Sequence, residues 1–304
     1  MGDREPPRSH SSLPPEGAAG GAGRPSATGA IRWPARLELT ARPDGGATRV
    51  HARHDGPLRL LKTLYPEGSA IAHAVLVHPP GGLVGGDRLD IALNVQPSAH
   101  LLVTTPAATR FYRSNAGAAS QVVTAQVAEG ARLEWLPQET LAYSGCDARN
   151  EVRLTLAPGA SLIASEVLGL GLPAAGQAFE RGRLLQHLEV TGHWLDRGWL
   201  DAADRALLDG PCGLAGHRVL GTLVYAQTGS LADAEALLTD SRALLDGVPR
   251  SGITHLAGPR GAVLLARVIG DEVETVTLAL RRVRALWRER LWALPSSDPR
   301  IWAT

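Results

Sequence analysis

Three segments of this chain repeat one strand–turn–strand pattern, and this repeat constrains the fold more than any other feature. Each segment alternates apolar and polar residues, passes through a four-residue turn, and continues into a second apolar strand. The turns end at Ala99, Ala131 and Ala160, which lie 32 and 29 residues apart. The period of two predicts strands with one buried face, and the spacing near 30 predicts that similar units stack.

Alignment on the three turn alanines brings apolar residues of the segments into the same positions. The coinciding sets are Ile91, Val123 and Val152; Leu93, Ala125 and Leu154; Val95, Val127 and Leu156; and Leu101, Leu133 and Leu162. We therefore predict a mainly β fold whose core is either a stacked β-helical solenoid or a sandwich of repeated hairpins.

The flanking segments predict the domain organisation. Residues 1–30 are rich in Gly, Pro, Ser and Ala and should form a disordered tail, and residues 31–304 should form a single β-rich domain. About two helices are expected late in the chain, one capped by Ser230 and one at about residues 275–294. The second helix carries several arginines, and we expect their side chains to form a face exposed to solvent. The alternative is that this face binds a partner.

Composition excludes several functional classes. The formal net charge of +1 gives no electrostatic reason to expect nucleic acid. No apolar run approaches the roughly 18 residues that a membrane span needs. With two cysteines and no export signal, we expect a cytoplasmic protein.

A glycine-rich turn at residues 78–87 joins two of the predicted strands. Four glycines in six positions allow backbone conformations that other residues adopt at a cost. The spacing matches neither a dinucleotide-binding loop nor a P-loop, and Asp87 stands where a P-loop has lysine. We interpret the segment as a structural turn that presents Asp87.

The candidate chemical residues are mainly carboxylates. Glu166 lies in an apolar strand and should be buried, so it needs a hydrogen-bond partner, a proton or a cation. Asp87 and Glu139 adjoin tight turns, where polar groups could converge or simply cap the turn. The ten histidines have no spacing that favours shared metal ligation, and no nucleophile has a visible base and orienting group.

Several longer stretches resemble one family, the urease accessory protein D family, also called UreD or UreH. The resemblance spans residues 31–230 at least. It is carried by residues 64–68, the turn at 78–87, residues 104–106 with 111–114, residues 133–140, and residues 210–211 with 213–218.

The resemblance implies a β-helical, non-catalytic scaffold that takes part in nickel insertion. Such a protein would bridge apo-urease to accessory protein F and, through F, to the GTPase accessory protein G. Nickel would pass through an internal polar tunnel toward the urease active site, with no tightly bound cofactor. Ligands along such a path should hold nickel weakly. The path residues expected on this basis are Asp87, Glu139 and Glu166, with Thr104, Thr105 and Tyr112 as weaker candidates.

Two other functions remain open from the residues alone. A β-solenoid enzyme acting on a polysaccharide would show a row of acids and aromatics along one face, but this chain has four tyrosines, two phenylalanines and seven scattered tryptophans. A nickel or zinc storage protein would bind metal tightly and stoichiometrically as the isolated chain. Equilibrium dialysis would separate storage from transit.

Overall fold

The computed structural model describes residues 34–303, so the tail expected at residues 1–30 lies outside the described residues. The first sheet has seven strands in the order β15-β14-β11-β8-β5-β1-β2. Its strands are β1 (Pro34–Asp44), β2 (Ala47–Asp55), β5 (Arg88–Val95), β8 (Ala119–Val127), β11 (Cys146–Leu156), β14 (Gly182–Val190) and β15 (Trp194–Asp201).

The second sheet has eleven strands, eight of them in the order β17-β18-β16-β12-β9-β6-β4-β3. These are β3 (Arg59–Leu64), β4 (Ile71–Val77), β6 (His100–Thr104), β9 (Arg132–Leu136), β12 (Ser161–Leu172), β16 (Val219–Thr228), β17 (Ser251–Gly258) and β18 (Gly261–Gly270). The short strands β7 (Thr109–Phe111), β10 (Thr140–Ala142) and β13 (Gln177–Ala178) join it to one side of this path.

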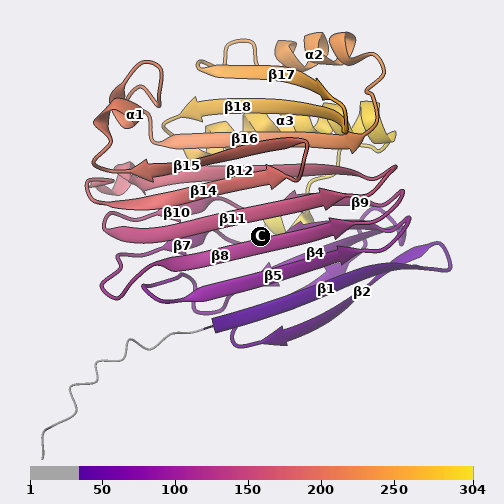
Figure 1. Cartoon of the computed structure of the whole chain (residues 1–304), viewed down its shortest axis with the longest axis horizontal. Helices are drawn as coiled ribbons and strands as arrows, with labels where there is room; N and C mark the ends of the chain where they lie inside the picture. Colours follow the sequence, from indigo (N-terminus) through magenta and orange to yellow (C-terminus); the bar gives the residue numbers. More distant parts are fainter. Residues whose placement is uncertain (1–33, 304) are drawn as a thin grey trace, which may run out of the picture. The chain divides into compact units, whose positions relative to one another are not determined.

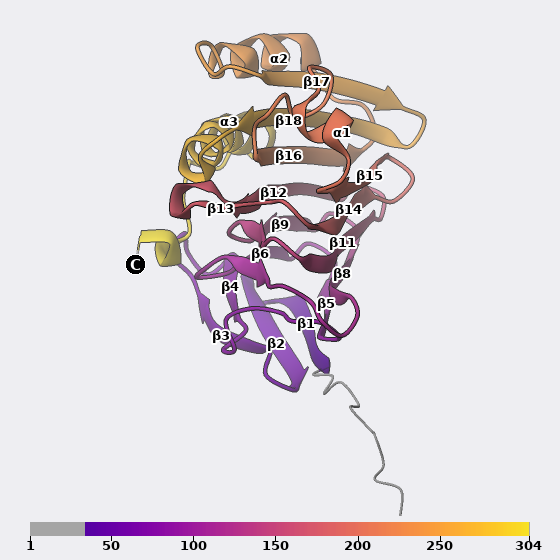
Figure 2. The ribbon, with the colours of Figure 1, turned by 90° about the vertical axis from the view of Figure 1, so that its left-hand side faces the viewer.

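The repeating segments form the coils of a β-solenoid. In each coil the chain passes from the first sheet to the second, as β5–β6, β8–β9 and β11–β12, and every strand pairs in parallel with its counterpart in the next coil (Figures 1 and 2). Val123 pairs with Ile91 and Val152, and Leu133 pairs with Leu101 and Leu162, as the alignment predicts. Strands within one unit do not pair with each other, which decides for the solenoid over repeated hairpins.

The turn alanines are buried because the turns stack like the strands. Ala99, Ala131 and Ala160 are at most 1% exposed. The amide of Arg132 donates to the carbonyl of Ala99 (2.9 Å), and that of Ser161 donates to the carbonyl of Ala131 (3.2 Å). The side chains of the three alanines belong to the apolar core inside the coils.

The second sheet separates two apolar cores. Its alternate side chains, such as Leu133 and Trp135 of β9, point into the solenoid, whereas Leu136 packs with the helices on the other side. The long helix α3 (Val273–Trp292) covers β12, β16 and β18, and α2 (Ala234–Ala243) covers β17 (Figure 2). The last described element is a short 3-10 helix, η2 (Arg300–Ala303).

The helices lie where the sequence predicts them, with two differences in detail. The first helix begins at Ala234 with Asp233 as its N-cap residue, so the expected cap at Ser230 is wrong. The short helices α1 (Arg205–Asp209) and η1 (Pro173–Ala175) were not predicted. Among the described residues, no helix has the length and apolarity that a membrane span requires.

Candidate functional site

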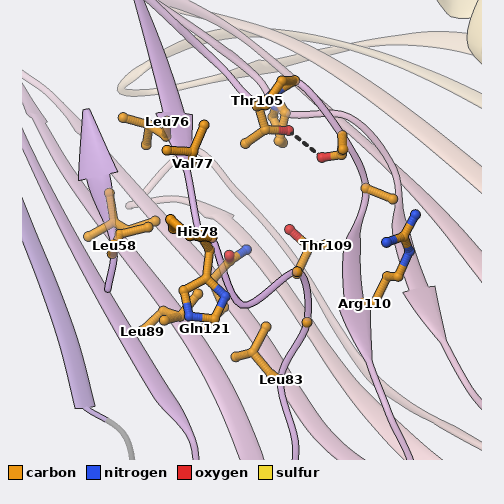
Figure 3. Close-up of a pocket in the computed structure, with 18 of the residues that line it drawn as sticks. Leu58, Leu76, Val77, His78, Leu83, Leu89, Thr105, Thr109, Arg110 and Gln121 are labelled. Carbon is orange, nitrogen blue, oxygen red and sulfur yellow. Dashed lines mark hydrogen bonds between the residues drawn. The ribbon is translucent and has the colours of Figure 1, made fainter. Parts of the chain in front are cut away.

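A cavity of about 270 Å³ opens into the solenoid between the turn at residues 78–83 and the loop at residues 105–110 (Figure 3). Its walls are mainly apolar and include the inward-facing side chains Leu89, Ile91 and Trp135. The polar side chains that line it include His78, Thr105, Thr109 and Gln121. The cavity therefore gives access from the surface to the interior of the coils.

The glycine-rich turn shapes this opening and fixes Asp87. Gly86 has φ of +90°, and a Cβ on Gly82 would clash with the ring of Tyr112. Asp87 Oδ2 accepts from the amide of Val84 (2.9 Å), which confirms the turn-capping interpretation. Its other oxygen, Oδ1, is buried with no hydrogen-bond partner among residues 34–303. Burial lowers the pKa of His78, and the charge of Asp87 opposes this shift.

A chain of buried amides leads from the cavity into the solenoid. Gln121, Asn150 and Gln186 occupy paired positions on β8, β11 and β14. Gln121 Nε2 donates to Asn150 Oδ1 (3.1 Å), and Asn150 Nδ2 donates to Glu166 Oε1 (3.0 Å) and to Gln186 Oε1 (3.2 Å). Gln186 Nε2 donates to Glu166 Oε2. We call these four residues the polar track.

Glu166 is the only ionisable member of the track. It is 6% exposed, as the sequence predicts, and none of the described residues forms an ion pair with it. Burial raises the pKa of Glu166 to about 8, the hydrogen bond from Asn150 opposes this, and the negative charge of Asp196 adds to it. A carboxyl group in this environment takes up a proton or a cation readily.

On the side of Glu166 away from the cavity, the next polar group is the partly exposed carboxylate of Asp196. Asp196 of β15, which acts electrostatically on Glu166, is about one-third exposed and forms an ion pair with Arg267 of β18. The cavity, the polar track and Asp196 together form a series of polar groups through an otherwise apolar core.

The structure places the six candidates from the sequence in different surroundings. Thr105 lines the cavity, where its hydroxyl donates to the carbonyl of Ala107 (2.9 Å). Thr104 lies on the opposite face of the second sheet and accepts from Trp302 Nε1 (2.8 Å). Glu139 lines a small hollow beside Arg281, and Tyr112 packs against Tyr143, with ring centroids 4.8 Å apart and the rings inclined at 58°.

Asp87 and Thr105 are thus close to the cavity and Glu166 lies on the track, whereas Thr104, Glu139 and Tyr112 do not join them. Within residues 34–303 no three His, Cys, Asp or Glu side chains are grouped to hold a metal ion. The donors that the track offers are amide and carboxylate oxygens, which hold divalent cations less tightly than thiolates or clustered imidazoles.

A second polar cluster lies between α3 and the outer face of the second sheet, and we call it the buried ion network. Arg284 Nη2 contacts Glu134 Oε2 (2.6 Å), and Arg288 contacts both Glu134 Oε1 (3.2 Å) and Glu67 Oε2 (2.8 Å). His73 Nε2 lies 2.8 Å from Glu67 Oε1, and His100 Nε2 lies 3.2 Å from Glu134 Oε1.

The expected solvated arginine face of α3 is therefore wrong at two positions. Arg284 is 2% exposed and Arg288 is 0% exposed. Burial alone would raise the pKa of Glu134, but Arg284, His100 and Arg288 outweigh it and hold that pKa well below its ordinary value. This network fastens α3 to the solenoid.

Sequence reasoning missed the amides of the track and the acids of the network. Gln121 and Asn150 fall at the same position of the repeat, which was a usable signal. Glu134 stands between Leu133 and Trp135, just as Glu166 stands in an apolar strand, and the same argument for burial applied to it.

The fold and the track define a class: a β-solenoid whose core carries a line of polar groups from a surface cavity to the partly exposed Asp196. Comparison with known proteins makes this specific. The family model described as "UreD urease accessory protein" matches residues 34–303. The chain therefore belongs to the UreD urease accessory protein family.

Relatives with this name agree with the assignment. The urease accessory protein UreD of Paracidovorax citrulli is 52% identical over 275 residues, covering 90% of this chain and 100% of the relative. Those of Variovorax paradoxus and Leptothrix cholodnii are 49% and 47% identical, with the same coverage of both chains. A role in urease maturation follows from this membership.

Proposed function

We propose that this chain is a non-catalytic scaffold that delivers nickel to urease through the interior of its solenoid. The polar track carries the proposal, because it supplies side-chain oxygen atoms as ligands for a cation across three coils of an apolar core. Glu166 has no cationic partner among the described residues, so a divalent cation beside it would offset the cost of its buried charge.

The proposed order of groups along the path follows from their positions. The cavity opens at the surface at one end of the path, and the partly exposed Asp196 lies at the other end. The four residues of the polar track lie between them. Amide oxygens and a single carboxylate bind a cation weakly enough for it to move on. In this proposal nickel is cargo, and the chain works together with apo-urease, accessory protein F and, through F, the GTPase accessory protein G.

The test compares urease purified from cells that contain every urease and accessory gene, with and without this chain. We expect urease made without the chain to be nickel-poor and inactive. Equal nickel contents would refute the proposal.

A variant separates transit from assembly. Glu166→Gln keeps the size of the side chain and one of its two acceptor oxygens but removes its charge. We expect it to lower the nickel content of urease by about tenfold or more, a typical loss when a group around a metal is changed, while the complex with urease still forms. Asp147→Asn, which removes a carboxylate from the outer face of the first sheet, is the matched control. Loss of the complex with Glu166→Gln would make Glu166 a folding residue instead.

A further inference from the structure

The row of amides in the first sheet reaches the surface at Gly198. Gln121, Asn150 and Gln186 occupy paired positions on β8, β11 and β14, and the next pair in the row joins Gln186 to Gly198 of β15. Residues paired in this way point to the same face of a sheet. The three amide residues are buried, whereas Gly198 is exposed. A Cβ added to Gly198 would have no atom within 4 Å beyond its own chain neighbours, so this end of the row is open.

A matching row runs along the second sheet from Glu166 to Arg267. Glu166 of β12 pairs with Thr222 of β16, and Thr222 pairs with Arg267 of β18. Because neighbouring strands lie about 4.8 Å apart, the backbone of Arg267 lies about 10 Å from that of Glu166. The next position in the row is Gly252 of β17, which also has open space where a Cβ would stand. The position beside Arg267 therefore carries no side chain that would restrain it.

An ion pair joins the ends of the two rows. Arg267 Nη2 contacts Asp196 Oδ2, and Asp196 lies two residues before Gly198, on the same face of β15. The side chains of Arg267 and Asp196 are 37% and 32% exposed. We call the opening bounded by Gly198, Asp196 and Arg267 the outer mouth of the polar track.

The guanidinium of Arg267 is held only weakly at the outer mouth. A partly exposed ion pair contributes little to stability, since water and salt screen both charges. Arg267 Nε is buried and has no hydrogen-bond partner in the part of the chain that the structure describes. Such an unpaired donor carries a desolvation cost that ends when the side chain turns into water. The open positions at Gly198 and Gly252 leave the side chain room to move while β18 keeps its place.

Arg267 and a divalent cation compete for the same carboxylate. Two positive charges at Asp196 repel each other, so the cation binds there only as the guanidinium moves away. A carboxylate freed in this way is an oxygen ligand at the surface end of the track.

We propose that Arg267 is a displaceable counter-charge that gates the outer mouth: nickel takes its place at Asp196, and the return of Arg267 to Asp196 releases the nickel. The proposal rests on the proposed function and deepens it, because it names the residue that controls one end of the path. In the empty chain Arg267 neutralises Asp196, and in the loaded chain its side chain extends into solvent.

The first experiment measures the binding of nickel chloride to the purified full-length chain by equilibrium dialysis. Arg267→Met keeps the aliphatic stem and removes the charge. We expect it to bind nickel about fivefold more tightly than the wild type, the gain from removing a partly exposed ion pair that competes with the metal. Unchanged nickel affinity in a folded Arg267→Met variant would overturn the proposal.

The matched control is Arg183→Met. Arg183 pairs with Asp147 on the outer face of the first sheet, and the side chain of Asp147 is 34% exposed, close to the value for Asp196. We expect this variant to bind nickel as the wild type does. An equal gain in Arg183→Met would show that any unpaired surface carboxylate has the same effect, and the outer mouth would lose its special role.

Two further variants test whether charge at the outer mouth is the cause. Arg267→Lys keeps the positive charge and should bind nickel as the wild type does. Asp196→Asn combined with Arg267→Met should lose the gain, because the freed carboxylate is then absent. A gain that appears in the lysine variant, or that persists without Asp196, would contradict the gate.

The nickel content of urease from cells that carry Arg267→Met tests the release step. We expect this content to fall although the variant itself binds nickel more tightly, because the charge that displaces nickel from Asp196 is missing. A folding defect would lower both the nickel affinity of the chain and the nickel content of urease. A normal nickel content would overturn the role of Arg267 in release.

The two proposals fail in distinguishable ways. Dialysis uses the purified chain alone, so its result does not depend on whether urease needs this chain. Normal nickel in urease made without the chain refutes the proposed function. Reduced delivery by Glu166→Gln together with wild-type nickel binding and delivery by Arg267→Met refutes the gate and leaves the path standing.

Discussion

At the residue scale, the environment of Glu166 predicts an unusual dependence of stability on pH. Its pKa is raised from 4.5 to about 8, so the folded state binds the proton more tightly than the unfolded state. Its contribution is therefore fully favourable below about pH 4.5 and is lost as the pH rises toward 8. We expect Glu166→Gln to remove this decline, so that the variant gains stability over the wild type as the pH increases from 5 to 8.

Urea unfolding of both proteins across this pH range measures the effect. Asp147→Asn serves again as the control, because Asp147 is partly exposed and paired with Arg183. Parallel curves for the wild type and Glu166→Gln would show that Glu166 titrates alike in the folded and unfolded states.

The two cysteines should differ sharply in reactivity. Cys146 is buried and burial raises the pKa of its thiol to about 11, whereas Cys212 is exposed. Because the thiolate is the reactive form, we expect iodoacetamide to label Cys212 alone in the native protein and both cysteines in urea. Mass spectrometry of the labelled peptides gives the answer, and native labelling of Cys146 would contradict the burial of β11.

The residues of the site show how far sequence reasoning extends. The burial of Glu166 could be predicted because it is a lone carboxylate in an otherwise apolar strand. Its partners could not, since Asn150 and Gln186 meet it only after β11 and β14 of the first sheet have come to face β12 of the second sheet across the core. Asp196 becomes relevant to Glu166 only through the folded arrangement of β15.

At the scale of elements, α3 shows what a helical pattern leaves undetermined. The sequence predicts the extent of α3 well. The pattern of charges along the helix does not show which residues the long arginine side chains contact. Arg284 reaches Glu134, 150 positions earlier in the sequence, and Arg288 reaches Glu67, 221 positions earlier. The same arginines also hold the C-terminal segment, by donating to the carbonyls of Ser297 (3.0 Å) and Pro295 (2.8 Å).

The buried ion network predicts a large cost for removing one partner. Arg284→Met keeps an apolar stem of similar length but leaves Glu134 without its closest cation. We expect a loss of about 3–5 kcal/mol in the free energy of unfolding, the range for breaking a buried ion pair. Arg282→Met, at an exposed position of the same helix, should change stability by no more than about 0.5 kcal/mol. Denaturant unfolding compares the two variants, and equal effects would mean that the network is not a strong restraint.

At the scale of the whole molecule, the repeat predicts the solenoid but not what surrounds it. The three aligned segments reproduce the observed register residue by residue. The later strands β16, β17 and β18 pair antiparallel and carry no copy of the repeat, so no internal comparison could place them. They extend the second sheet beyond the coils, and this extension gives α2 and α3 a surface to cover.

The shared second sheet makes the solenoid and its helices one cooperative unit. Neighbouring residues of β9 and β12 point into different cores: Leu133 and Leu162 pack inside the coils, whereas Leu136 and Ile163 pack against the helices. Trp287 of α3 is fully buried in the outer core, so Trp287→Ala should cost about 3–5 kcal/mol. We expect this loss to lower the unfolding midpoint of the inner core equally, because the outer core cannot open without exposing the strands that both cores share. Far-UV circular dichroism, which follows the strands and helices together, and exchange of the amide hydrogens of β8, which lies in the first sheet, test this. A variant whose helices unfold first while β8 stays protected would show two separable units.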